Sequence, residues 1–378
     1  MPLHKKIIIS ANSAWNVVNF RKGIVLELIN HGFEVVVVSP KDEYVDKLCD
    51  LGCQHININV DNKGINPIND LYLTFQYLKI FYQVDPNVIL TYTVKPNIYG
   101  SLAAYILSIP IVNNISGLGT AFIRGGLLGR IVNFLYKISL RKSECVFFQN
   151  HDDENLFLKK NLVTKGQVSV LPGSGVNLEY YQPTKSNIVN KDQDEFVFLL
   201  IARLIWDKGI QEYVDAARFV KKYNPKARFQ ILGFLDVDNQ TAVSHSEIDL
   251  WVAEGIVEYI GVTEDVRPHI NSSDCVVLPS YREGVPKTLL EAAAMGKSII
   301  TTEVEGCKDV VDDGVNGYLC NVRDYNDLAE KMQTMLTMNS KDIEQMGLNG
   351  RKKMEQEFDE KIVINKYISI VNKIINGQ

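Results

Sequence analysis

Short apolar runs alternate along this chain with segments in which apolar residues recur every three or four positions. The runs at residues 7–9, 34–38 and 87–92 are rich in Ile, Val and Leu at consecutive positions, which is typical of parallel strands buried on both faces. The segments between the runs have the spacing of amphipathic helices. This alternation predicts an α/β fold with doubly wound parallel sheets.

The alternation extends through two halves of the chain. In the first half we predict strands at residues 7–9, 34–38, 54–60, 87–92, 110–114, 145–148 and 168–171, and helices at 20–30, 42–51, 70–84, 152–160 and one ending at 105. In the second half we predict strands at 196–201, 228–232, 257–260, 275–278 and 298–302, and helices at 212–223, 265–272, 327–337, 341–356 and 359–375. Each half has enough strands for a sheet of its own.

The length of 378 residues favours two or three domains at roughly 150 residues each. We predict a first domain at residues 1–180 and a second at 181–358, with the last helix, 359–378, packing back on the first. Ligands of open α/β sheets bind beyond the carboxyl ends of the strands. The polar turns that follow the strands should therefore line a cleft between the two domains.

Composition narrows the classes of protein. The hydrophobic fraction of 46% and charged fraction of 22% are those of an ordinary globular protein, and the net charge of −5 disfavours a nucleic-acid binder. The six cysteines contain no Cys-x-x-Cys pair, which favours buried, reduced thiols in a cytoplasmic protein. No segment reaches the roughly 18–20 apolar residues that span a bilayer, and the apolar run near the N-terminus is too short for a signal peptide. Any contact with a membrane is expected at its surface.

The stretch from residue 275 to residue 296 predicts a strand, a turn and a helix. Pro286 suits the first helical position and Gly296 suits the helix end. The amides at the start of such a helix attract phosphate. Two carboxylates, Glu283 in the turn and Glu291 in the helix, accompany this predicted phosphate site. They could act as an acid–base pair or as acceptors for sugar hydroxyls, and we favour the acceptor role for Glu291.

Two cations flank an earlier turn after a buried strand. Arg203 and Lys208 lie five positions apart, and such a pair can clamp a diphosphate. Two solvated charges are the common alternative for any Arg–Lys pair. The position directly after a strand favours the clamp.

The sequence predicts no metal ion and no redox cofactor. The six histidines have no metal-ligand spacing, and Asp236-Val237-Asp238 is interpreted as a solvated turn. No Gly-x-Gly-x-x-Gly follows the first strand, and Gly117-Leu118-Gly119 after the fifth is only a weak phosphate-loop signal. A dinucleotide-dependent oxidoreductase is therefore disfavoured.

The segment 124–142 predicts a basic amphipathic helix. Arg130, Lys137 and Arg141 lie beside an apolar face formed by Leu127, Ile131, Phe134, Leu135 and Ile138. Such a helix can lie on an anionic membrane, or it can pack on the sheet with a solvated basic edge. Both interpretations stay open, and the cluster also suits a polyanionic acceptor such as a lipid diphosphate.

These motifs together resemble the retaining GT-B glycosyltransferases of family 4. The resemblance rests first on Ala202-Arg203-Leu204 with Lys208-Gly209. It rests also on Glu283 and Glu291, which are separated by seven residues, and on the segments 172–177 and 312–317. It implies two Rossmann-like domains facing each other across a cleft. In the first half, residues 95–97 and 117–119 and the basic helix are similar to bacterial enzymes that add an N-acetylhexosamine to an undecaprenyl-diphosphate-linked sugar.

The resemblance implies a role for each matching position. Arg203 and Lys208 would bind the nucleotide diphosphate, Glu283 would hold the donor sugar, and Glu291 would accept from the ribose. Other candidates for binding the nucleotide sugar are Gly284, Val285, Thr288, Leu289, Gly233, Asn12 and Ser13. Candidates for binding the acceptor are Lys95, Gly117, Gly119, Arg124, Arg130 and Lys137.

One position departs from the family pattern. Many members carry a first-domain histidine near the donor, and none of His4, His31 or His55 lies in a predicted cleft turn. Lys95 or the Asn12-Ser13 turn would occupy that space, which leaves the catalytic base unassigned.

The sequence therefore predicts a metal-independent, retaining transferase that uses a UDP-sugar as substrate and requires no cofactor. Its partners would be a polyprenyl-diphosphate-linked sugar and an anionic membrane surface, at the inner face of the cytoplasmic membrane. Two other classes remain. A GT-B epimerase would convert a UDP-sugar without an acceptor, and a peripheral scaffold would release no UDP.

Overall fold

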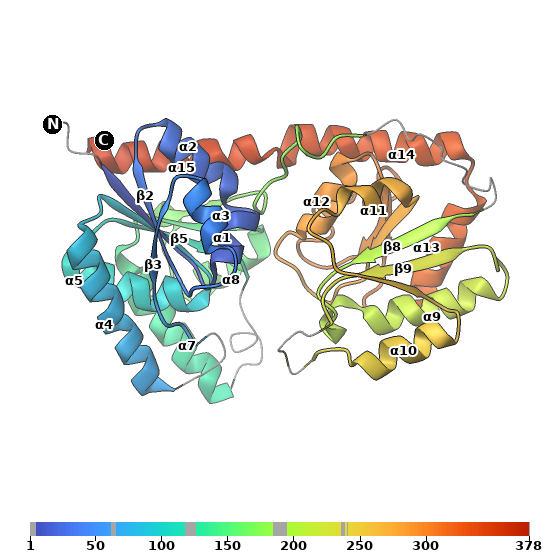
Figure 1. Cartoon of the computed structure of the whole chain (residues 1–378), viewed down its shortest axis with the longest axis horizontal. Coiled ribbons are helices and arrows are strands. Elements are labelled where there is room, and N and C mark those ends of the chain that lie inside the picture. The colour runs from blue at the N-terminus through green and yellow to red at the C-terminus, as the bar shows by residue number, and fades with distance from the viewer. Residues whose placement is uncertain are drawn as a thin grey trace. The chain divides into compact units, whose positions relative to one another are not determined.

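A computed structural model describes residues 5–61, 66–117, 126–183, 195–235, 239 and 241–377. The chain forms two compact units (Figure 1): the first comprises Met1–Ser174 with Lys361–Gln378, and the second comprises Gly175–Glu360. The sequence placed the boundaries at 180/181 and 358/359. The structural boundaries differ because Val176 pairs with Asp359, so the segment after Ser174 is joined to the second unit.

The first unit is built on a seven-stranded sheet with the order β3-β2-β1-β4-β5-β6-β7, and all its strands are parallel. Its strands are β1 (Lys6–Ser10), β2 (Glu34–Ser39), β3 (Gln54–Asn57), β4 (Val88–Tyr92), β5 (Ile111–Ile115), β6 (Cys145–Phe148) and β7 (Val168–Val170). Its helices are α1 (Ala14–Phe20), α2 (Lys22–Asn30), α3 (Val45–Asp50), α4 (Pro67–Val84), η1 (Pro96–Gly100), α5 (Ser101–Leu107), α7 (Gly126–Ser139), η2 (Leu140–Lys142), α8 (His151–Lys159) and η3 (Lys165–Gln167).

Successive strand residues face opposite sides of this sheet, so each side has its own core. Ile7 and Ile9 lie in a buried cluster with residues of α1, α2 and α3, whereas Ile8 packs with residues of α4 and α5. The last helix, α15 (Glu360–Asn376), contributes Tyr367 and Val371 to the first of these clusters. The helix predicted at 20–30 is α2, which begins at Lys22, and α1 precedes it as a separate helix that the sequence did not predict.

The second unit is built on a six-stranded parallel sheet with the order β10-β9-β8-β11-β12-β13. Its strands are β8 (Val197–Ile201), β9 (Arg228–Leu232), β10 (Glu258–Gly261), β11 (Cys275–Leu278), β12 (Ser298–Thr302) and β13 (Gly317–Cys320). Its helices are η4 (Trp206–Lys208), α9 (Ile210–Lys221), α10 (His245–Ala253), α11 (Arg267–Ser272), α12 (Lys287–Ala294), α13 (Tyr325–Thr337), α14 (Ser340–Lys353) and η5 (Met354–Phe358). The sequence did not predict β13.

The strand order places particular turns next to each other. In the second unit β8 lies between β9 and β11, so the connections reverse direction there and the turns that follow β8 and β11 are neighbours. In the first unit β1 lies between β2 and β4 in the same way. Among the described residues, no helix is long and apolar enough to cross a membrane.

Candidate donor-nucleotide site

The turns after β8 and β11 bring Lys208 and Glu283 into contact. Lys208 Nζ donates a hydrogen bond to Glu283 Oε1, and Ser280 Oγ donates to the same oxygen at 2.8 Å. The side chains of Lys208 and Glu283 are 17% and 13% exposed, so the pair is largely shielded from solvent. The structure therefore joins a predicted diphosphate cation directly to the predicted sugar-binding carboxylate.

The backbone fixes these two turns against each other. Tyr281 N donates to Asp207 O at 2.9 Å. Gly209 has a φ of 70°, and a Cβ there would lie 2.0 Å from Pro279 O, so only glycine permits this approach. The fixed backbone of the two turns therefore keeps Lys208 and Glu283 within reach of each other.

Arg203 lies in the turn after β8 with its side chain exposed, and its guanidinium makes no hydrogen bond or ion pair with any residue that the structure describes. Its backbone surroundings are fixed, since Leu204 N donates to Phe234 O at 3.0 Å and Gly233 packs against Ala202. A Cβ on Gly233 would lie 1.7 Å from Ala202 O, so any side chain there would displace the turn. The guanidinium is thus available to an anionic ligand on a rigid base.

Helix α12 begins one residue later than predicted. Pro286 is its N-cap residue, because its φ of −74° and ψ of 114° are those of extended backbone. Gly296 lies just beyond the end of the helix with a φ of 71°. No side chain caps this N-terminus. Leu289 N donates to Pro286 O at 3.0 Å, so this amide, predicted to cap a phosphate, has a backbone partner. Thr288 Oγ1 donates to Ile201 O at 3.3 Å, which ties α12 to the end of β8.

The side chain of Glu291, in helix α12, is buried. It is 6% exposed, and its Oε1 accepts a hydrogen bond from Tyr181 OH at 2.7 Å. Lys287 Nζ lies 3.4 Å from the same oxygen. Burial raises the pKa of the Tyr181 phenol, and the neighbouring carboxylate raises it further, so the phenol stays protonated as a donor. Oε2 of Glu291 has no partner among the described residues and can accept from a ligand.

Sequence reasoning missed Tyr181 and Ser280. Tyr181 is separated from Glu291 by 110 positions, and no motif in the sequence relates the two. Ser280 comes directly before the turn that carries Glu283, and a hydroxyl three residues from a carboxylate is a usable signal. Gly284 and Val285 lie in this same turn, where Val285 packs partly buried against the core.

Candidate residues of the first unit have structural partners that the sequence did not indicate. Lys95 forms an ion pair with Asp70 at 2.6 Å, and Tyr99 OH donates to the other oxygen of that carboxylate at 2.7 Å. Ser13 is the N-cap residue of α1, where its side chain accepts from Asn16 N at 3.1 Å, and Asn12 precedes it in the turn after β1.

The remaining candidates lie at or near β5 and α7. Gly117 follows β5, and Arg130 and Lys137 are exposed on α7. Gly119, Arg124 and the Asp236–Asp238 turn lie outside the described residues. Within the described part of the chain, no group of three His, Cys, Asp or Glu side chains could hold a metal ion.

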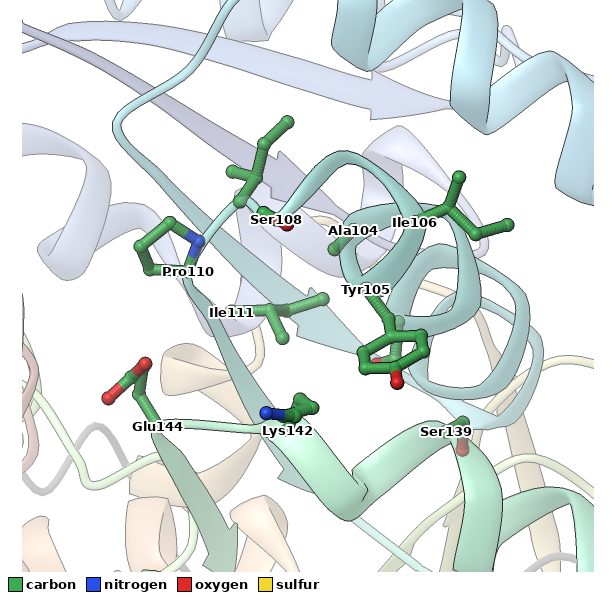
Figure 2. Close-up of a pocket in the computed structure, with 11 residues that line it drawn as sticks. Ala104, Tyr105, Ile106, Ser108, Pro110, Ile111, Ser139, Lys142 and Glu144 are labelled. Atoms are coloured by element: carbon green, nitrogen blue, oxygen red, sulfur yellow. The ribbon is translucent and has the colours of Figure 1, made fainter.

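A pocket in the first unit lies at the amino ends of the strands, whereas the predicted turns lie at their carboxyl ends. Figure 2 shows it near Pro110 and Ile111, at the amino end of β5, with Tyr105, Lys142 and Glu144 among its lining residues. None of the predicted site residues lines it. It is therefore separate from the predicted site.

Two tandem units with all-parallel sheets have the architecture of the GT-B fold, and a solved structure of the Anabaena protein HepE in complex with UDP-glucose shares this fold. The TM-score is 0.80 at 18% sequence identity, and the alignment covers 99% of this chain and 100% of that one. Residues 6–150 match the family model "Glycosyl transferase 4-like", and residues 182–353 match "Glycosyl transferases group 1". The chain belongs to the family 4 glycosyltransferases, as the motifs in the sequence predicted.

Two relatives have informative names. The chain is 30% identical to the N,N'-diacetylbacillosaminyl-diphospho-undecaprenol alpha-1,3-N-acetylgalactosaminyltransferase of Campylobacter jejuni, with 96% of this chain and 97% of the relative covered. It is 22% identical to the UDP-Gal:alpha-D-GlcNAc-diphosphoundecaprenol alpha-1,3-galactosyltransferase of Escherichia coli, with 79% and 78% covered. Both relatives are named as acting on a sugar linked to undecaprenyl diphosphate.

Proposed function

We propose that this glycosyltransferase moves an N-acetylhexosamine from a UDP-sugar to a saccharide linked to a polyprenyl diphosphate, with retention at the anomeric carbon. The contact between Lys208 and Glu283, together with the exposed Arg203 in the turn after β8, carries the proposal. Support also comes from the Campylobacter relative, which is named as an N-acetylgalactosaminyltransferase, from the Escherichia coli relative, which is named with UDP-Gal, and from the UDP-glucose complex of the Anabaena protein.

The charges at this site match those that develop when the sugar–phosphate bond breaks. Negative charge grows on the departing diphosphate, and Arg203 and Lys208 would stabilise it as preorganised cations. Positive charge grows on the sugar, where the carboxylate of Glu283 is held by Lys208 and Ser280. In this proposal the cations and the N-terminus of α12 neutralise the diphosphate, so no metal ion is required.

Glu291 would bind the ribose of the donor. Its Oε1 is fixed by Tyr181, and its Oε2 is left to accept a hydrogen bond from a ribose hydroxyl. A carboxylate used for this purpose does not exchange protons with the substrate. The proposal therefore assigns the two glutamates to binding and positioning and not to an acid–base pair.

The acceptor would bind to the first unit. Arg130 and Lys137 on α7 would attract its diphosphate, and Asp70 would have to release Lys95 before that cation could bind an anion. Since a polyprenyl chain is held in a bilayer, we infer that the protein works at the inner face of the cytoplasmic membrane, on precursors of a surface polysaccharide.

The test is release of UDP from a panel of UDP-sugars, with and without a short-chain polyprenyl-diphosphate saccharide. We expect release that depends on the acceptor and is fastest with a UDP-N-acetylhexosamine, and the proton coupling at the anomeric carbon of the product should show retention. Formation of an epimeric UDP-sugar without acceptor would favour an epimerase, and no release with any donor would favour a scaffold. Either result would overturn the proposal.

A further inference from the structure

Half of the exposed large apolar side chains that the structure describes lie on three helices of the first unit. They are Ile68, Leu71, Tyr72, Phe75 and Tyr82 of α4, Tyr105 and Ile106 of α5, and Leu128, Ile131, Phe134 and Ile138 of α7. Soluble proteins rarely leave a large apolar patch exposed unless it binds something. We call this set, with the basic residues of α7 and η2, the docking surface.

Helix α4 is apolar on both its inner and outer sides. Its inner side packs in the core through Leu73, Tyr77, Ile80 and Phe81. On the outer side Ile68 and Leu71 are 77% and 73% exposed. The outer face of a helix that lies against water is normally polar. Asp70, the carboxylate in the first turn of α4, is paired with Lys95, so it adds no free negative charge to this face.

Helix α7 also exposes apolar side chains, and it adds positive charge. Tyr136 is its buried anchor, whereas Ile131, Phe134 and Ile138 are 48%, 61% and 42% exposed. The apolar face that the sequence predicted is therefore not fully packed on the sheet. Residues 126–142 contain four basic residues and no acidic residue, in a chain whose net charge is −5. Arg130, Lys137, Arg141 and Lys142 are all exposed.

The three helices are neighbours in the fold. Both α4 and α7 pack against α5, and both also pack against η1. Figure 1 shows α4, α5 and α7 on one side of the first unit. Tyr105 and Ile106, the exposed apolar residues of α5, also line the pocket of Figure 2.

We propose that the docking surface binds the surface of an anionic lipid bilayer, with the outer side chains of α4 and α7 inserted among the lipids. Apolar side chains supply the burial, and the basic residues of α7 meet the headgroups. The tyrosines at 72, 82 and 105 have the amphipathic side chains that favour the interface. A second copy fits less well, since a symmetric dimer through this surface would bring the basic residues of two α7 helices together.

This inference extends the proposed function, because an acceptor on a polyprenyl diphosphate lies in a bilayer, but its first test needs no transfer activity. The full-length protein is sedimented with vesicles of phosphatidylcholine alone or mixed with phosphatidylglycerol. We expect binding to the anionic vesicles. The double variant Leu71→Gln/Phe75→Gln should bind them about tenfold more weakly or worse, since it removes two inserted apolar side chains.

The charge contribution is tested separately. Arg141→Gln and Lys142→Gln should each weaken binding to anionic vesicles about fivefold, and high salt should remove this difference. The matched control is Leu250→Gln/Leu348→Gln, which replaces exposed apolar residues of α10 and α14 in the second unit and should bind like wild type. Circular dichroism should show all these variants folded, because every replaced side chain is exposed.

Three outcomes would overturn the inference. The first is a wild-type protein that does not bind anionic vesicles, and the second is an α4 variant that binds them as the wild type does. The third is a wild-type dimer that becomes a monomer in the α4 variant while vesicle binding stays unchanged. A transfer assay distinguishes failure of this inference from failure of the proposed function. Leu71→Gln/Phe75→Gln should keep activity on a short-chain, water-soluble acceptor and lose it on a full-length acceptor in vesicles. If the wild type transfers to neither acceptor, the proposed function fails while the vesicle result stands.

Discussion

The phenol of Tyr181 donates a 2.7 Å hydrogen bond to Oε1 of Glu291, across 110 residues of chain. Tyr181 lies in the segment that enters the second unit, and this segment is itself fixed. The guanidinium of Arg351 donates to Tyr181 O at 2.7 Å and to Ala294 O, at the end of α12, at 2.8 Å. The orientation of the predicted ribose carboxylate therefore depends on the entry segment as well as on its own helix.

Tyr181→Phe should raise KM for the UDP-sugar about tenfold and leave kcat near the wild-type value. The reason is that the lost hydrogen bond fixes a carboxylate that binds the ribose equally in the ground state and the transition state. The measurement is steady-state UDP release at varied donor concentration. Tyr180→Phe is the matched control. The guanidinium carbon of Arg267 lies 3.7 Å from the centre of the Tyr180 ring, and phenylalanine keeps this ring. An unchanged KM in Tyr181→Phe would contradict the ribose role of Glu291.

Arg203→Ala should lower turnover by about 10²–10³, as expected for the loss of one preorganised charge at the leaving group. Its thermal stability should match wild type, because the side chain is exposed and has no partner among the described residues. Arg203→Lys should recover part of the activity, since lysine restores the positive charge but lacks the planar guanidinium that can bind two phosphate oxygens at once. Lys222→Ala, which removes an exposed cation at the end of α9, is the control. Near wild-type turnover in Arg203→Ala would exclude it from the diphosphate site.

Most of the fold could be predicted because apolar runs bury on both faces of a parallel sheet. The run at 275–278 is an example, and it is β11 in the structure. The strand β13 was missed because Gly317–Cys320 is short and directly follows the turn residues Asp313-Gly314-Val315-Asn316. The first helix was predicted to begin at residue 20, yet α1 begins at Ala14, because Ser13 caps the helix.

Part of the candidate site could be predicted for a related reason. Lys208 and Glu283 each follow a predicted strand, which was enough to expect both at the same end of a sheet, but the order that makes β8 and β11 neighbours was not predicted. Contacts that depend on packing at long range could not be predicted. The Tyr181–Glu291 bond and the Asp70–Lys95 ion pair involve no sequence motif. Periodicity also could not show that the outer side of α4 is apolar as well as its inner side, because a helix with apolar residues all round has no distinct face.

Thiol reactivity should distinguish Cys49 from the other five cysteines. Cys49 is exposed, whereas the others are buried. Burial raises the pKa of Cys145 to about 11 and that of Cys53, Cys307 and Cys320 to about 12, and it also raises the pKa of Cys275. Since the thiolate is the reactive form, buried thiols with raised pKa values should stay unreactive at mildly alkaline pH. One fast-reacting thiol is expected with Ellman's reagent in the native protein and six in guanidinium chloride. Cys49→Ser should abolish the fast phase, and a second fast phase in native protein would contradict the burial.

The contact between Lys208 and Glu283 predicts that the two side chains act as a unit in turnover. Lys208→Met should lower kcat by about 10²–10³, because it removes a cation at the leaving diphosphate. Glu283→Gln should lower kcat by a similar factor, because Lys208 loses its charged partner and the sugar loses its carboxylate. The double variant should be no slower than the worse single variant, as expected for coupled residues. The measurement is kcat for UDP release at saturating donor and acceptor.

Ser280→Ala is the matched control for this cycle, because it removes the other hydrogen bond to Glu283 Oε1 and leaves both charges in place. It should lower kcat only about 3–10-fold, the usual effect of one neutral hydrogen bond. If the losses in Lys208→Met and Glu283→Gln instead multiply in the double variant, the two residues act independently. The ion pair would then be a feature of the unliganded protein alone, and Glu283 would contact the sugar without orienting Lys208.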